Sequence, residues 1–164
     1  MSPNLSLKSS GPTFWTDSAR GERDEKFYIY AQEFRRASLK TGSPLIKAYL
    51  LGYALELFLK TYLLTHGIEE RDLKKKKFGH RIAKLLGESR CLGLDRVLRV
   101  SPELVEDITA FGHVYGAKDL EYFSILHLLV PPRLPNLRRF VRFAQLFDNK
   151  LGDHFEAVTL RPRS

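Results

Sequence analysis

The sequence has very little cysteine: Cys91 is the only one among its 164 residues. A single cysteine excludes internal disulfides and a multi-cysteine metal site, and it fits a protein of a reducing compartment. We therefore expect the chain in the cytoplasm. Cys91 has no sequence partner that would make it a catalytic nucleophile, and we expect it to pack in the core or at its edge.

Long hydrophobic runs are also missing. The longest, Ala48 to Leu59, contains the charged residue Glu56, whereas a membrane-spanning helix needs about 20 apolar residues. Residues Met1 to Thr13 are polar and contain no apolar stretch such as a secretory signal needs. We therefore predict that the protein has no membrane partner.

The sequence lacks the common motifs for phosphate and metal binding. Neither G-x-G-x-x-G nor G-x-x-x-x-G-K-[ST] occurs in it. Its histidines form no H-E-x-x-H pair, and no carboxylates accompany them at the spacing of metal ligands. The sequence therefore predicts no cofactor and no metal site.

What the sequence does contain is enough apolar material for one folded domain. It is 43% hydrophobic and has eleven phenylalanines, which is too apolar for a disordered chain. A chain of this length buries about two-thirds of its unfolded surface, so it needs no disulfide or metal to fold. We predict a flexible segment over residues 1–16, one domain over 17–156 and a tail over 157–164.

Apolar residues recur at helical spacing, and no segment alternates as a half-buried strand would. We expect the segment 68–78 to be an exposed loop or a frayed turn, and the segment 116–134 to hold a short helix or an extended stretch. The sequence thus predicts an all-α fold, a four- to five-helix up-and-down bundle. Helices are expected from near Ser18 to Lys40, Pro44 to about Thr65, near Gly79 to Gly93, Pro102 to about Tyr115, and Pro135 to about His154.

The helix predicted from Pro44 to Thr65 is apolar nearly all round, so we expect it at the centre of the bundle. Glu56 and Lys60 lie four residues apart on it, share one face and are predicted to pair. The pair is interpreted either as a structural ion pair that ties helices together, because buried charges need partners, or as a polar site between helices.

The formal net charge of +8 is unevenly distributed. Residues 71–100 contain ten basic and three acidic side chains, and residues 133–150 contain five basic and one acidic. Such clusters are typical of salt-dependent binding to RNA or DNA, but they also suit an acidic protein partner or solubility alone. Phe140 and Phe143 beside the second cluster are either stacking platforms for bases or core residues. The predicted binding residues are Lys74, Lys75, Lys76, Lys77, Arg81, Arg138, Arg139 and Arg142.

Two stretches of the sequence resemble the bacterial HEPN domains. They are G-Y-A-L-E-L-F-L-K (Gly52 to Lys60) and G-H-R-I-A-K-L-L (Gly79 to Leu86). In that family an apolar helix of the form A-x-E-L-x-L-K is followed by a loop and then by G-H-x-L-x-x-L. The segment Tyr115 to Phe123 is similar to the region before the last helix of the family. The resemblance covers about Phe27 to Leu151.

The resemblance implies an up-and-down bundle, often a homodimer, from toxin-antitoxin, phage-defence or RNA-processing systems, in some cases beside a nucleotidyltransferase or an antitoxin. Its catalytic members are metal-independent ribonucleases with an arginine four to six residues before a histidine. No histidine here has an arginine at that spacing, since the nearest ones before His80 and His154 are Arg71 and Arg142. We therefore expect a non-catalytic RNA-binding or interaction module, with a diverged ribonuclease as the alternative.

Several residues are candidates for catalysis in the ribonuclease interpretation. A histidine at position 80 that lies near Glu56 could act as a general base, or it could only cap the helix that follows. A second pair, His113 and Tyr115, could stand near a cleft or simply pack. The candidates are His80, Glu56, Lys60, His113 and Tyr115.

Overall fold

The described part of the chain consists of seven helices and contains no strand. The computed structural model describes residues 14–75, 78, 80–116, 134 and 136–159, and within these ranges the side chains from Arg23 to Phe155. The prediction of an all-α fold is confirmed. In chain order the helices are α1 (Phe14–Lys40), α2 (Pro44–Thr65), α3 (Glu70–Leu73), α4 (Ile82–Cys91), α5 (Leu94–Val97), α6 (Pro102–Gly116) and α8 (Leu137–Thr159).

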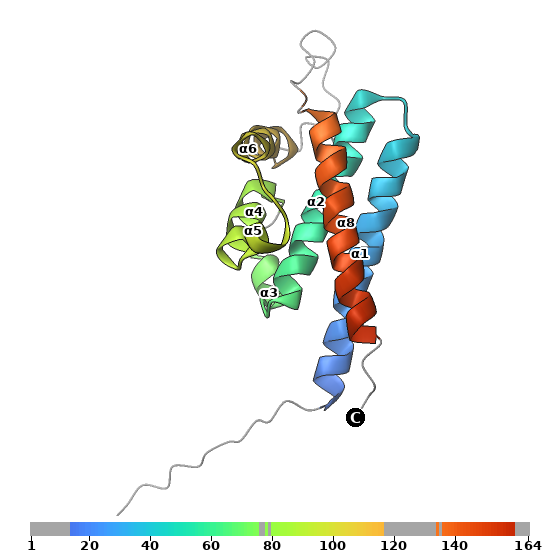
Figure 1. The fold of residues 1–164 in the computed structure, drawn as a ribbon, viewed down its shortest axis with the longest axis vertical. Coiled ribbons are helices and arrows are strands. Elements are labelled where there is room, and N and C mark those ends of the chain that lie inside the picture. The colour runs from blue at the N-terminus through green and yellow to red at the C-terminus, as the bar shows by residue number, and fades with distance from the viewer. Residues whose placement is uncertain (1–13, 76–77, 79, 117–133, 135, 160–164) are drawn as a thin grey trace, which may run out of the picture.

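Three long helices form the up-and-down part of the bundle. Figure 1 shows α1 running antiparallel to α2, and α8 running in the same direction as α2. The remaining helices, α3 to α6, lie to one side of these three, and α6 is seen nearly end-on, so it crosses the long axis. Since α2 contacts α1, α4 and α8, it is the central helix that its all-round apolar sequence predicts.

The ends of α2 follow from local sequence. The Ser43 side chain accepts a hydrogen bond from the Ile46 N–H at 3.4 Å, and Pro44 occupies the first turn, where its missing N–H costs nothing. Beyond the other end, Gly67 has a φ of +89°, a left-handed conformation that glycine adopts without strain. The helix therefore has the bounds that the sequence predicts.

Other boundaries differ from the prediction by a few residues. The segment expected to be an exposed loop or a frayed turn contains the single helical turn α3, and α4 begins at Ile82, two residues after His80. Helix α1 begins at Phe14, inside the segment predicted to be flexible, and α8 continues into the predicted tail. Of the ambiguous segment 116–134, residues 117–133 lie outside the described part of the chain.

The core lies around α2 and is built from side chains of every long helix. Phe58 of α2, Phe111 of α6 and Phe140 of α8 are at most 2% exposed. Cys91, in contrast, is exposed at the end of α4, which rules out packing in the core, the first of the two alternatives expected for it. None of the described helices is long and apolar enough to cross a membrane.

Candidate functional site

Four of the five catalytic candidates meet at one buried carboxylate. The Glu56 side chain is 2% exposed and lies in the middle of α2. Its Oε1 accepts from the Lys60 Nζ at 2.5 Å, and its Oε2 lies 3.0 Å from the His80 Nδ1. The Tyr115 hydroxyl donates to the same Oε2 at 2.8 Å. The predicted Glu56–Lys60 pair is confirmed, and we call these four residues the Glu56 cluster.

The three partners of Glu56 lie on three separate elements. Lys60 lies one turn later on α2, His80 in the turn before α4, and Tyr115 in the last turn of α6. Tyr115 reaches α2 because Gly52, one turn before Glu56, has no side chain. A Cβ built at Gly52 would lie 2.9 Å from both the Phe111 and the Tyr115 rings. This glycine therefore leaves room beside α2 for two aromatic rings of α6.

The environment of Tyr115 fixes the direction of its hydrogen bond. Burial raises the pKa of the Tyr115 phenol well above its ordinary value, and the neighbouring Glu56 carboxylate raises this pKa further. The phenol consequently stays protonated and acts as a donor to Glu56. A buried carboxylate with three partners satisfies the requirement that a charge taken out of water be compensated.

The Glu56 cluster opens onto a cavity of about 260 Å³ between α1, α2 and α3. The His80 side chain is 48% exposed there, and the Lys60 side chain is 14% exposed. Only the Nδ1 of His80 is used by Glu56, and its Nε2 has no hydrogen-bond partner among the described residues. We call this space the His80 cavity, and its lining residues are Phe27, Lys60, Glu70, Leu73, Lys74 and His80.

His80 does not cap α4. The N-cap position of that helix is occupied by Arg81, which makes no capping bond through its side chain. His80 instead turns back onto α2, where its ring nitrogen meets Glu56. The interpretation of His80 as a helix cap is therefore wrong, because a charged, buried partner from another helix satisfies the ring better than the exposed loop does.

His113 is not part of the Glu56 cluster. Residues two positions apart on a helix face different directions, so Tyr115 is buried against Glu56 while His113 is exposed. His113 lines another cavity together with Arg81. Among the described residues, no arginine forms a hydrogen bond or ion pair with the Glu56 cluster. The arrangement thus provides an oriented histidine and a lysine, without the arginine of the ribonuclease pattern.

The first basic cluster is partly balanced by acidic side chains on α3. Lys74 pairs with Glu70 at 2.7 Å, and Lys75 pairs with Asp72. Hydrogen bonds from these lysines lower the pKa values of Glu70 and Asp72. Exposed ion pairs of this kind contribute little to the stability of the fold, and their side chains exchange readily with other charged partners. Lys76 and Lys77 lie outside the described residues.

The second basic cluster lies apart from the lysines that follow α3. Figure 1 shows that α8 begins near the top of the view, whereas α3 lies in its lower half. Arg138 and Arg142 are exposed there, while Arg139 pairs with Asp107 of α6. The two phenylalanines of this helix, Phe140 and Phe143, are 0% and 3% exposed. They are core residues, which excludes the interpretation as stacking platforms.

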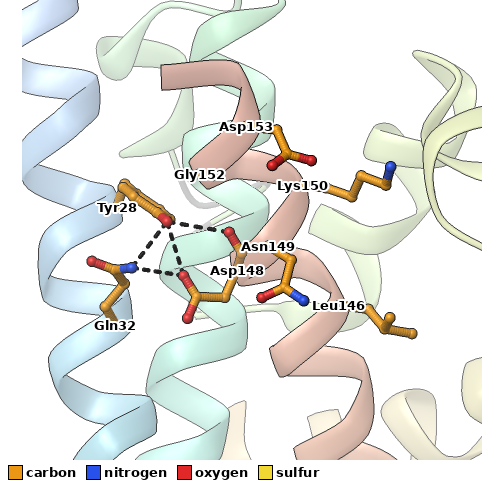
Figure 2. A pocket seen from close by; sticks show the side chains of 8 residues that line it. All are labelled: Tyr28, Gln32, Leu146, Asp148, Asn149, Lys150, Gly152 and Asp153. Carbon is orange, nitrogen blue, oxygen red and sulfur yellow. Dashed lines mark hydrogen bonds between the residues drawn. The ribbon is translucent and has the colours of Figure 1, made fainter. Parts of the chain in front are cut away.

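Sequence reasoning missed a second buried polar cluster, between α1 and α8. Figure 2 shows Tyr28 and Gln32 of α1 pointing toward Asp148 of α8. Their hydrogen bonds to the Asp148 Oδ1 measure 2.9 and 2.8 Å, and Arg35 forms an ion pair with Oδ2 at 2.8 Å. Arg35 and Asp148 are both buried. The sequence signal that could have revealed this cluster is Asp148, a lone acidic residue on the apolar stripe of α8. Such a residue needs a cationic partner when it is buried.

No protein-family model, curated protein or solved structure matches this chain. Among the described residues, no group of three or more histidine, cysteine, aspartate or glutamate side chains is arranged to hold a metal ion. The fold and the site together define a class: an all-α protein in which a buried carboxylate fixes a histidine and a lysine at an open cavity.

Proposed function

We propose that this chain is an RNA-binding module that holds single-stranded RNA at the His80 cavity. The observation that carries the proposal is that buried Glu56 fixes Lys60 and His80 at the cavity, which also presents Lys74 and the partly buried ring of Phe27. Cations that contact phosphates, together with an aromatic ring on which a base stacks, are the features that single-strand binders combine.

The aromatic ring favours RNA over an acidic protein. Glutamate and aspartate side chains would use the cations of the His80 cavity, but they have no aromatic ring that could stack on Phe27. The similarity of two sequence stretches to HEPN domains supports the same choice. On that resemblance we also propose a homodimer that acts in a toxin-antitoxin, defence or RNA-processing system, beside a nucleotidyltransferase or antitoxin partner.

The test is the affinity of the full chain for a fluorescently labelled single-stranded RNA, measured by anisotropy over a range of salt concentrations. The double variant Lys74→Ala/Lys75→Ala should bind more weakly, and each lost phosphate contact should reduce the salt slope by about 0.7. A matched control is Arg36→Ala/Lys40→Ala, which also removes two exposed cations but near the other end of the bundle. Absence of binding by the unmodified chain would overturn the proposal.

A second candidate function, metal-independent RNA cleavage, is favoured by the orientation of His80. A histidine held through Nδ1 by a carboxylate presents its other nitrogen as a general base for a ribose hydroxyl, and Lys60 would stabilise the negative charge that develops on the phosphoryl oxygens. Incubation of RNA with the protein in the absence of divalent metal decides between the two functions. Cleavage that is lost in His80→Ala but kept in His113→Ala establishes the enzyme, and binding without cleavage supports the module.

A further inference from the structure

A second cavity, distinct from the His80 cavity, lies between the beginning of α4 and one face of α6. Its volume is about 400 Å³, and we call it the α4–α6 groove. It shares no lining residue with the His80 cavity, although consecutive residues, His80 and Arg81, line the two. The lining residues of the groove are Arg81, Ile82, Ala83, Lys84, Thr109, Gly112 and His113.

The groove collects cationic side chains, and none of its lining residues within the described part of the chain is acidic. Arg81, Lys84 and His113 are all exposed, and none of them forms an ion pair within the described part of the chain. This distinguishes them from Lys74, Lys75 and other surface cations that are paired with acids of their own region. Two permanent cations and a histidine facing one concave surface create a positive potential that favours an anion.

Gly112 of α6 lies against the first turn of α4. A Cβ built on it would lie 3.7 Å from both the Cβ and the backbone nitrogen of Ala83. Among the lining residues that the structure describes, the only side-chain hydroxyl, that of Thr109, donates to the Val105 carbonyl. Arg81 and Lys84 occupy the N-cap position and the first turn of α4, where the helix dipole adds to their positive charge.

We propose that the α4–α6 groove binds one phosphate group of the RNA. This proposal rests on the proposed function of RNA binding. The planar guanidinium of Arg81 suits two phosphate oxygens at once, and Lys84 supplies a second, more mobile charge. A strand lying in the His80 cavity would continue past His80 and Arg81, so the neighbouring phosphate would enter the groove. The ligand is therefore a phosphodiester within the chain, with a terminal phosphate as the alternative source of the same chemistry.

The test uses the full chain and the variant Arg81→Gln/Lys84→Gln. The variant should bind labelled single-stranded RNA at least tenfold more weakly and with a salt slope lower by about 1.4, the value for two lost contacts. A second variant, Gly112→Ala, adds only a methyl group at ordinary contact distance, so it should fold normally and bind more weakly because the methyl group narrows the groove between Gly112 and Ala83. Comparison of 5′-phosphorylated and 5′-hydroxyl oligonucleotides separates a terminal from an internal phosphate.

The outcomes separate this proposal from the proposed function. If the unmodified chain binds RNA and both variants bind it equally well, the groove is not a phosphate site, although RNA binding stands. If the unmodified chain binds no RNA, the proposed function fails. Titration with inorganic phosphate, followed by NMR of the backbone amides, then tests whether the groove binds phosphate. Saturable shifts at Ala83 and Gly112 that vanish in Arg81→Gln/Lys84→Gln support the site, and the absence of saturable shifts overturns it.

Discussion

At the scale of single residues, Glu56 determines the chemistry of the site. It is a buried carboxylate whose two oxygens are shared by a lysine, a histidine and a tyrosine. Each partner restricts the others: Tyr115 and His80 share Oε2, which leaves Oε1 for Lys60. The histidine and the lysine therefore face the cavity in fixed positions, and a ligand that meets them does not have to order them first.

The titration of Tyr115 gives the first prediction. Its pKa in the folded protein lies above the ordinary value of 10.0, so above pH 10 the unfolded chain releases a proton that the folded chain retains. The free energy of unfolding should therefore fall as the pH rises beyond about 10, and fall less in Tyr115→Phe. Urea unfolding at pH 8 and at pH 11 measures this difference. An identical loss in both proteins would show that Tyr115 ionises freely in the folded state.

At the scale of helices, the contact of two aromatic rings of α6 with α2 is what completes the site. The Tyr115 ring lies beside Glu56 because Gly52 has no side chain that would occupy this space. Close packing of this kind leaves no room for an added methyl group unless the rings of Phe111 and Tyr115 move. The geometry of the Glu56 cluster therefore depends on a residue that carries no functional group.

The second prediction compares two glycines within helices. Gly52→Ala should destabilise the protein by about 1–3 kcal/mol, because its Cβ would lie 2.9 Å from two aromatic rings. Gly87→Ala on α4 meets nothing within 4 Å, so it should stabilise by about 0.5–1 kcal/mol through helix propensity. Thermal and urea unfolding of both variants test this. Equal effects of the two substitutions would contradict the close packing of the Phe111 and Tyr115 rings on Gly52.

At the scale of the whole molecule, the buried polar cluster around Asp148, between α1 and α8, joins the first and the last long helix. Arg35 and Asp148 are 113 positions apart in the chain, and both are buried between α1 and α8. Figure 2 shows how the side chains of Tyr28 and Gln32 converge on the same carboxylate. Every partner of Asp148 in this network comes from α1, so the network ties α8 to α1 alongside the central helix α2.

The third prediction concerns this connection. Asp148→Asn leaves the buried Arg35 without its counter-charge and should destabilise the protein by about 3–5 kcal/mol, a large part of the stability of an ordinary domain. The control is Asp107→Asn, which breaks the more exposed pair with Arg139 and should cost less than about 1 kcal/mol. Chemical denaturation measures both. If Asp148→Asn lowered the free energy of unfolding by as little as the control does, the network would not be a major contributor to stability.

The sequence by itself determined the elements of this protein. Helical periodicity and the Ser-Pro start at residue 43 place α2 within its observed bounds, because these signals act over a few neighbouring residues. The spacing of Glu56 and Lys60 was sufficient to predict their pair for the same reason. The all-round apolar character of α2 also predicted its central position.

Only the tertiary structure decided what meets Glu56 and Asp148. His80, Tyr115 and Arg35 lie 24, 59 and 113 positions from the carboxylates that they contact, and no local pattern specifies pairing over such distances. The separation of His113 from Tyr115 and the gathering of Arg81, Lys84 and His113 in one groove were likewise decided by how α4 and α6 pack. Periodicity identifies which face of a helix is buried, but packing chooses the partner that this face receives.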